Sequence, residues 1–306
     1  MVLDLNFKGF MAPVFTPFNR KTGEVDVSII KSYAQHLLKS GVQGVLVNGT
    51  VGEGVCMSVA ERKIVLEAWL EAAKKTSLHV MVQIGGPSLR DVQELAKHAE
   101  DNGVSSILCL CDLFHRPSNV HELTHYLTLV SLAAPKTPLL YYHIPSFTGV
   151  NLDMEDFLKA GSLKIPTLAG IKFTHNNLEE GSRCLRLNNG RFTVLLGNDQ
   201  LIAAGFFEGF NSLIATTLNM FATLISEIHQ TVNETTHVNL ARSKQFRLTT
   251  IINTIIRYGK WVPAMKEAMY IITGLDFGEA REPQGRMTPE QIIQLRSDLS
   301  SLDLVN

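Results

Sequence analysis

The chain has 306 residues, and 45% of them are hydrophobic, which is enough to fill one large core. Its formal net charge of −1 provides no basic surface for nucleic acid or an anionic membrane, so we expect neither as a partner. No apolar run approaches the roughly eighteen residues that a transmembrane helix needs, and residues 1–8 lack the features of a signal peptide. Four cysteines in this length are typical of a reducing compartment, which predicts a cytoplasmic protein.

Eight short runs rich in Val, Ile and Leu show little alternation of polarity, which is typical of strands buried on both faces of a parallel sheet. These runs are residues 10–15, 44–47, 80–84, 106–110, 138–143, 168–173, 193–196 and 212–215. Helical periodicity occupies most of the gaps between them. The first helical pattern, residues 28–39, stops at Gly41, and the pattern 88–102 begins with the N-cap residue Ser88 and stops at Gly103.

Eight strands that alternate with helices over about 220 residues predict an α/β fold of the (β/α)8 TIM-barrel type. An open, doubly wound sheet is the competing fold, but it usually has fewer strands, and no G-x-G-x-x-G follows the first run. From about Phe221 onward the pattern is helical throughout. We therefore expect residues 1–220 to form the barrel with its catalytic site. Residues 221–306 are expected to form a C-terminal helical extension that packs on the barrel as part of one folding unit.

In such a barrel, the active site lies just past the carboxyl ends of the strands. Hydroxyls, a carboxylate, several glycines and one lysine occupy those positions in this chain. They are Gly49, Thr50, Gly85, Tyr142, Lys172, Gly197, Asn198, Asp199, Thr216 and Thr217. This composition predicts a polar site for a small molecule.

Lys172 stands alone near the end of the apolar run 168–173. An apolar setting disfavours the charged form of a lysine, so the amine becomes a nucleophile that can form a Schiff base with a carbonyl. The structural alternative is a lysine whose amine reaches solvent from a strand end. Neighbouring parallel strands lie about 4.8 Å apart, so Tyr142 on the preceding run can contact Lys172. Tyr141 has the opposite parity and is expected to face the helices.

Two other motifs carry weaker signals. Residues 49–53 form a glycine-rich turn whose backbone N–H groups suit an anionic carboxylate or phosphate, and the capping box Ser58–Glu61 predicts a helix after it. Residues 121–125 match the zinc signature H-E-x-x-H, but this segment belongs to the helix after the fourth strand, away from the catalytic rim, and no third ligand is apparent. Cys109 and Cys111 lack a second nearby pair. We therefore expect no metal site.

The ordered set of motifs resembles the N-acetylneuraminate lyase and dihydrodipicolinate synthase superfamily of class I aldolases, and within it the animal lyases most. The likeness runs from Gly9 to about Pro283. It is carried by Ala12–Phe18, Gly49–Glu53, Tyr142–Gly149 and Gly170–Phe173.

This resemblance implies roles for particular residues. Lys172 is similar to the Schiff-base lysine, Tyr142 to the tyrosine that shuttles the proton, and Thr50 to the hydroxyl beside the pyruvate carboxylate. The implied substrate-binding residues are Val51, Thr174, Gly197, Asp199, Gln200 and Thr216.

The resemblance also implies the reaction, a retro-aldol cleavage of N-acetylneuraminate (sialic acid) to N-acetylmannosamine and pyruvate. No metal or organic cofactor is expected, because the lysine itself supplies the electrophile. The superfamily further implies a homotetramer.

Several residues depart from the family pattern. Val51 replaces a second hydroxyl residue, Gln200 stands where sialic acid lyases carry a glutamate, and Ala215 and Leu218 replace a glycine and a tyrosine. Two alternatives follow from these changes: a lyase of the same mechanism for another 2-keto-3-deoxy sugar acid, and a catalytically weak relative that binds sugar acids. Phe147 replaces the arginine of the synthase branch, which argues against that branch.

Overall fold

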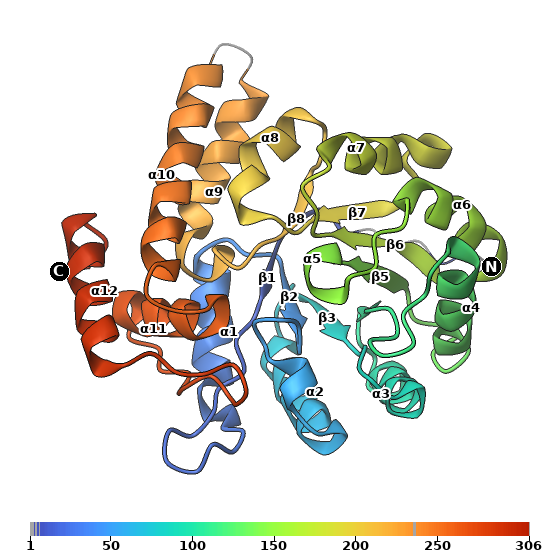
Figure 1. Cartoon of the computed structure of the whole chain (residues 1–306), viewed down its shortest axis with the longest axis horizontal. Helices are drawn as coiled ribbons and strands as arrows, with labels where there is room; N and C mark the ends of the chain where they lie inside the picture. The colour runs from blue at the N-terminus through green and yellow to red at the C-terminus, as the bar shows by residue number, and fades with distance from the viewer. Residues whose placement is uncertain (1–2, 4, 6, 235–236, 306) are drawn as a thin grey trace. The chain divides into compact units, whose positions relative to one another are not determined.

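The computed structural model describes residues 3, 5, 7–234 and 237–305. Eight parallel strands close into a barrel in chain order, which confirms the predicted fold (Figure 1). The strands are β1 Gly9–Pro13, β2 Gly44–Val47, β3 His79–Gln83, β4 Ser106–Cys109, β5 Leu139–His143, β6 Leu168–Phe173, β7 Thr193–Leu196 and β8 Ser212–Ile214. Each end of a predicted run lies within two residues of the observed strand end.

Helices separate the strands, and further helices follow the last strand. They are α1 Ile30–Lys39, α2 Val59–Ala73, α3 Leu89–Asp101, α4 Val120–Ser131, α5 Pro145–Thr148, α6 Met154–Lys164, α7 Leu178–Arg186, α8 Ile202–Phe207, α9 Leu218–Asn233, α10 Val238–Ile256, α11 Trp261–Thr273 and α12 Pro289–Ser301. The predicted caps are confirmed, because Ser58 forms a reciprocal capping box with Glu61 and Ser88 accepts a hydrogen bond from the Asp91 N–H. In the described part of the chain, every helix is too short or too polar to cross a membrane.

The chain divides into two compact units. One consists of Met1–Met11, Gln43–Leu46 and Ser77–Ala215, and it contains most of the barrel strands with α3 to α8. The other consists of Ala12–Val42, Val47–Thr76 and Thr216–Asn306, and it contains α1, α2 and α9 to α12. The expected boundary between residues 220 and 221 falls within α9. The division into a barrel and a C-terminal extension stays a prediction.

In the first unit, the pairing of β5 with β6 places Tyr142 opposite Lys172, and the pairing of β6 with β7 places Lys172 opposite Leu195. Tyr142 and Leu195 belong to one buried apolar cluster. Tyr141, one residue earlier, points to the other face, where its ring lies 5.2 Å from that of Phe157 on α6. The predicted parity of the two tyrosines is therefore confirmed.

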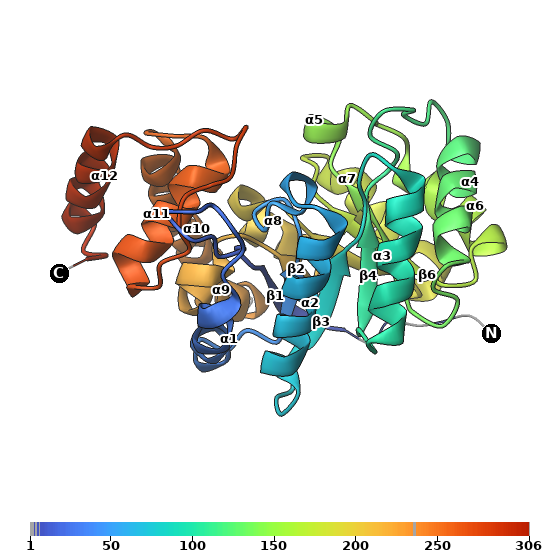
Figure 2. The same ribbon diagram turned by 90° about the horizontal axis from the view of Figure 1, so that it is seen from below.

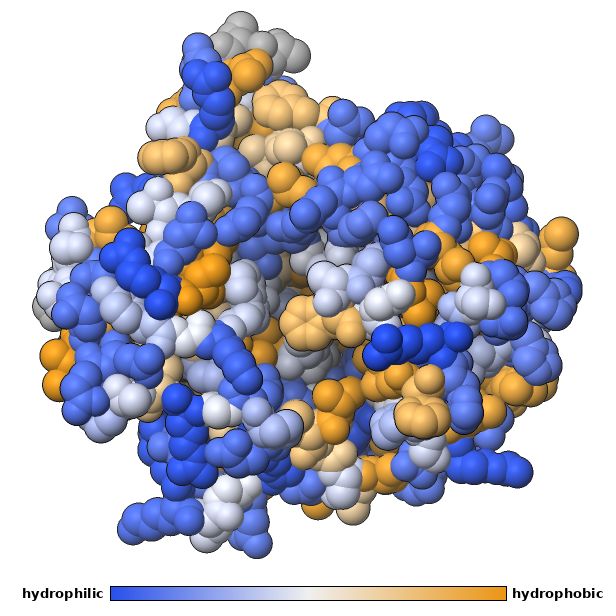
Figure 3. Space-filling model, viewed as in Figure 1, coloured by the Kyte–Doolittle hydropathy of each residue, from blue (hydrophilic) through white to orange (hydrophobic). Residues whose placement is uncertain are grey.

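The outer face of this unit is polar where α6 and α7 cover the strands. Hydrophilic residues gather over these helices in Figure 3. Arg183 on α7 forms ion pairs with Asp153, Glu155 and Glu179, and Lys159 pairs with Glu155. Charged side chains on the outside and apolar ones on the strands explain why these helices pack in one orientation.

The second unit is built mainly from helices, and α9 and α10 lie side by side in it (Figures 1 and 2). The ring of Tyr33 on α1 lies 5.3 Å from that of Trp69 on α2 and 4.6 Å from that of Phe277 after α11. The Tyr33 hydroxyl also donates a hydrogen bond to Asn219 Oδ1 on α9, at 2.5 Å. This buried contact connects segments that are far apart in the sequence.

Candidate functional site

Lys172 lies on β6 with only 4% of its surface exposed. Its Nζ atom lies 4.0 Å from the centroid of the Tyr142 ring, as the strand register requires. Among the described residues, Lys172 forms no ion pair. The lysine thus does not reach solvent from a strand end but presents its amine, buried, to the face of an aromatic ring.

Thr174 and Gly197 lie close to this amine. The N–H of Thr174 donates to the carbonyl of His143 at 2.8 Å, and the N–H of Gly197 donates to the carbonyl of Phe173 at 2.9 Å, so both loops continue the strand pairing. A Cβ atom on Gly197 would lie 2.0 Å from Thr174 Oγ1 and 3.3 Å from Lys172 Cε. The buried Thr174 Oγ1 has no hydrogen-bond partner within the described residues. Buried hydroxyls are rarely left unpaired, so this one is a candidate ligand contact.

Asp199 and Gln200 follow β7 directly, as predicted. Asn198 caps this turn by accepting from the Gln200 N–H at 3.0 Å, and its Nδ2 donates to Asn176 Oδ1 at 2.7 Å, which connects the loops after β7 and β6. Asp199 is buried, whereas Gln200 is exposed. Their roles as substrate contacts stay predictions.

The turn at residues 49–53 belongs to the second unit and follows β2. It is closed by hydrogen bonds from the Glu53 N–H to the Thr50 carbonyl at 3.1 Å and from the Gly54 N–H to the Gly49 carbonyl at 3.2 Å. Within the described residues, the N–H groups of Val51 and Gly52 have no acceptor, although both residues are buried. Buried N–H groups are nearly always paired, so these two donors are available to an anion.

Glu53, the last residue of this turn, forms a buried ion pair with Lys266 that sequence reasoning missed. Glu53 Oε1 lies 2.8 Å from Lys266 Nζ on α11, and the two side chains are 0% and 1% exposed. Glu53 Oε2 accepts from the Arg281 N–H and from Gln284 Nε2, each at 2.7 Å. Burial lowers the pKa of Lys266, and the Glu53 carboxylate opposes this effect. The signal in the sequence was a lysine at position 266 within an apolar helix.

Thr216, also in the second unit, is buried, and its Oγ1 accepts a hydrogen bond from the indole N–H of Trp261 at 3.3 Å. Thr216 is predictable as a site residue from its position after β8, whereas Trp261 is not. Forty-five residues separate the two, so their contact depends on tertiary packing.

His143 is a second residue that sequence reasoning passed over. It is fully buried at the end of β5, and its ring stacks on that of Phe173 with a centroid distance of 5.4 Å. Burial, together with nearby His175, lowers the pKa of His143 to about 3, so the ring is neutral. Both ring nitrogens lack a hydrogen-bond partner among the described residues. Because its parity is opposite to that of Tyr142, His143 faces away from the Lys172 amine.

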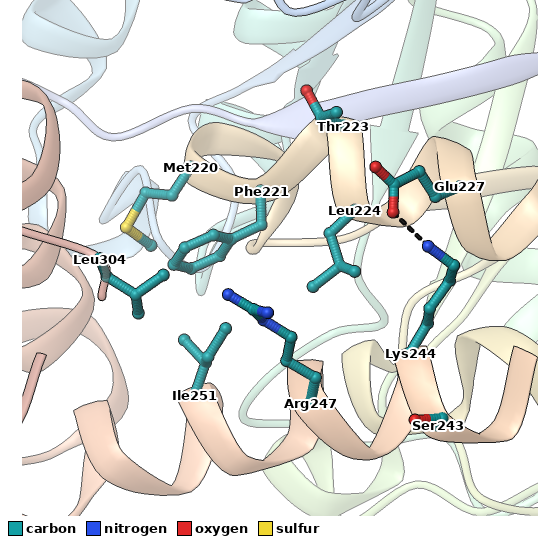
Figure 4. Close-up of a pocket in the computed structure, with 10 residues that line it drawn as sticks. All are labelled: Met220, Phe221, Thr223, Leu224, Glu227, Ser243, Lys244, Arg247, Ile251 and Leu304. Atoms are coloured by element: carbon teal, nitrogen blue, oxygen red, sulfur yellow. Dashed lines mark hydrogen bonds and ion pairs between the residues drawn. The ribbon is translucent and has the colours of Figure 1, made fainter. Parts of the chain in front are cut away.

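A separate cavity of about 500 Å³ lies between α9 and α10 in the second unit (Figure 4). Phe221, Leu224 and Ile251 form apolar walls, and Arg247 extends between them. Lys244 pairs with Glu227 at its edge. None of the predicted site residues lines this cavity, so it is not the site of the predicted chemistry.

A closed parallel barrel with helices between its strands defines the class of (β/α)8-barrel proteins, and this one has a buried lysine on one strand beside a tyrosine ring on the next. The chain belongs to the dihydrodipicolinate synthetase family, whose model matches residues 6–302. This confirms the resemblance inferred from the motifs.

Particular relatives are similar over nearly the whole chain. The N-acetylneuraminate lyase of Mus musculus is 32% identical over 301 residues, which cover 98% of this chain and 93% of that protein. The structure of N-acetylneuraminate lyase from Proteus mirabilis is 33% identical, with a TM-score of 0.92, and the match covers 98% of this chain and 99% of that one. The enzyme from Aliivibrio salmonicida, also called a sialic acid aldolase, is 31% identical with a TM-score of 0.92 and covers 98% of each chain.

Proposed function

We propose that this chain is an N-acetylneuraminate lyase, a carbon–carbon lyase that cleaves N-acetylneuraminate to N-acetylmannosamine and pyruvate through a Schiff base on Lys172. The buried Lys172 amine over the Tyr142 ring is the observation that carries the proposal. Full-length relatives that bear this name, at 31% to 33% identity, support the choice of substrate.

In the proposed reaction, Lys172 and Tyr142 account for each bond and proton that moves. The amine of Lys172 attacks the C2 ketone of the open-chain sugar acid, and loss of water gives a protonated imine. Tyr142 accepts the proton of the C4 hydroxyl, the C3–C4 bond breaks, and its electron pair moves into the imine. N-acetylmannosamine leaves as the aldehyde, and the remaining enamine is protonated at C3 and hydrolysed to pyruvate and free lysine.

The remaining residues bind the substrate in this proposal. The Thr174 hydroxyl, which has no partner among the described residues, supports a contact with the substrate near Lys172. Gly197 leaves space for the Thr174 side chain in this position. Asp199, Gln200 and Thr216 bind the sugar chain by resemblance to the family. Thr50 and the turn with Val51 receive the carboxylate, which agrees with the two N–H groups that lack an acceptor among the described residues.

Borohydride trapping with pyruvate tests the mechanism. Reduction converts the imine to a stable secondary amine, so mass mapping is expected to find one modified lysine, at position 172. Lys172→Ala is the control and should form no adduct. An adduct on another lysine, or none in the wild-type protein, would refute the Schiff-base mechanism, and the identity of the aldehyde released from N-acetylneuraminate tests the substrate.

A second candidate is a lyase of the same mechanism for a shorter 2-keto-3-deoxy sugar acid. The departures at Gln200, Ala215 and Leu218 favour it, because they alter the sugar end and leave Lys172 and Tyr142 unchanged. Comparison of kcat/KM for N-acetylneuraminate with that for shorter 2-keto-3-deoxy acids separates the two. A catalytically weak binding protein, which Val51 favours, would release pyruvate no faster than the Lys172→Ala variant.

We further propose a cytoplasmic homotetramer. All four cysteines are free, which agrees with a reducing compartment. The tetrameric state is proposed from the resemblance to the family. Sedimentation equilibrium is expected to give four times the chain mass of 33.9 kDa, and a monomer would contradict the proposal.

A further inference from the structure

We propose that Lys266 and Glu53 are positioning residues for the substrate carboxylate: their buried ion pair fixes the turn at residues 49–53 and neutralises its acidic side chain. This inference rests on the proposed function, because it assumes that the turn receives the carboxylate of a 2-oxo acid. Neither residue contacts the reacting atoms. Both act through the backbone donors of Val51 and Gly52.

Both members of the ion pair form further hydrogen bonds with described residues. Glu53 uses one carboxylate oxygen for Lys266 and the other for the Arg281 N–H and Gln284 Nε2. Lys266 Nζ donates in addition to the carbonyl of Glu279 at 3.2 Å. A buried ion pair is stable only when further hydrogen bonds satisfy both ions, and this one meets that condition. The position of the Glu53 side chain is therefore fixed by the segment that follows α11.

The backbone of the turn cannot move independently of that side chain. Glu53 has a φ of 56°, in the left-handed region, and its N–H closes the turn on the Thr50 carbonyl. A Cβ on Gly54 would lie 2.1 Å from the Asn48 carbonyl oxygen, so the chain passes very close to itself here. Because left-handed backbone costs free energy for a residue other than glycine, contacts outside the turn must maintain it. The contacts of the Glu53 side chain do so.

Charge gives the pair a second role. Glu53 lies only two residues beyond Val51, and an unpaired carboxylate there would repel a substrate carboxylate in a site of low effective dielectric. Lys266 cancels that charge. Its Nζ and the Arg281 guanidinium lie 4.5 Å and 4.4 Å from the Phe18 ring centroid, which places two cations beside the turn.

The experiment compares Lys266→Met, Glu53→Gln and the double variant with the wild-type protein. The readouts are the pyruvate concentration that half-saturates borohydride trapping, KM and kcat for cleavage, and the melting temperature. Lys266→Met should raise both half-saturation values about tenfold or more, because the turn donors lose their alignment and a bare carboxylate remains, whereas kcat at saturation falls much less. The neutral ester methyl pyruvate should lose less affinity than pyruvate.

The double variant separates positioning from stability. It contains no unpaired buried charge, so its melting temperature should recover relative to the single variants, but its KM should stay high because the turn has lost its contact with α11. Glu53→Gln retains the shape of the side chain, and the double variant, which has no unpaired buried charge, keeps the test available if a single variant does not fold. Leu295→Ala, a cavity variant in α12 of the same unit, is the matched control and should lower the melting temperature with KM unchanged.

Two failures are distinguishable. If the wild-type protein forms no pyruvate adduct, the proposed function fails and this inference with it. If the wild-type protein forms the adduct but every pair variant retains its half-saturation values within about twofold, the function stands and the positioning role is overturned.

Discussion

At the scale of single residues, the site depends on the contact between the Lys172 amine and the Tyr142 ring at 4.0 Å. The two residues lie opposite one another on β5 and β6, so the ring lies against the amine whether or not the phenol hydroxyl takes part in the reaction. The ring and the hydroxyl therefore have separable roles. In the proposed reaction, the ring packs against the lysine and the hydroxyl moves the proton.

Tyr142→Phe tests that separation. The variant keeps the ring, so borohydride trapping of pyruvate at Lys172 should persist. Its kcat for cleavage should fall about 10²- to 10⁴-fold, the usual contribution of a general base. Stopped-flow or steady-state pyruvate release measures the effect. The matched control is Tyr141→Phe, whose hydroxyl lies on the helix side, and its kcat should stay close to that of the wild-type protein. Equal losses in both variants would contradict the assigned role.

At the scale of elements, the close approach of β6 and β7 shapes the site. A Cβ on Gly170 would lie 1.9 Å from the Thr193 carbonyl oxygen, so only glycine permits the two strands to pair at this point. Gly197 has the same function just past the end of β7, where it makes room for the Thr174 side chain. Glycine at these two positions therefore permits β6 to pair with β7 and leaves space beside the Thr174 and Lys172 side chains.

Gly197→Ala should disturb the site more than the fold. The new Cβ displaces Thr174 and then Lys172, and overpacking of this kind costs about 1–3 kcal/mol of unfolding free energy. We expect the pyruvate adduct to form less completely and kcat/KM to fall, with urea denaturation as the measure of stability. Thr174→Ala is the control, since it removes the hydroxyl without adding bulk. If Gly197→Ala were as active as the wild-type protein, the space beside Thr174 would not be used by the substrate.

At the scale of the whole molecule, buried titratable groups couple global stability to pH. His143 has a folded-state pKa of about 3, against an ordinary value of 6.5, so the unfolded chain binds the extra proton between these values. Stability must therefore rise with pH through this window and be lost as pH falls from 6.5 toward 3. His79, lowered to about 4 by burial, acts in the same direction.

His143→Phe should flatten this dependence. It keeps an aromatic ring against Phe173 and removes the titration, so the loss of unfolding free energy between pH 6.5 and pH 4 should be smaller by about 1.4 kcal/mol per pH unit. Urea midpoints measured across that range test the expectation. His125→Gln, at an exposed position on α4, should show the wild-type slope. A parallel curve for His143→Phe would mean that His143 is not buried as a neutral ring.

Much of the fold and part of the site followed from the sequence. The eight apolar runs predicted the strands because residues buried on both faces leave a continuous apolar signature. Strand parity predicted that Tyr142 would contact Lys172 and that Tyr141 would face the helices. These inferences succeeded because strand period and chain order are local properties, and a closed parallel barrel converts them into positions without further information.

The long-range contacts between buried polar side chains could not be predicted in this way. Glu53 and Lys266 are 213 residues apart, and nothing local to either indicates its partner. The same is true of Thr216 with Trp261 and of His143 with His175. Sequence by itself determined the barrel, the family and the strand positions of Lys172 and Tyr142, because periodicity and motif order are local properties of the chain. Only the tertiary structure decided which buried charges and hydroxyls meet, because that depends on how distant segments pack to satisfy groups that have left water.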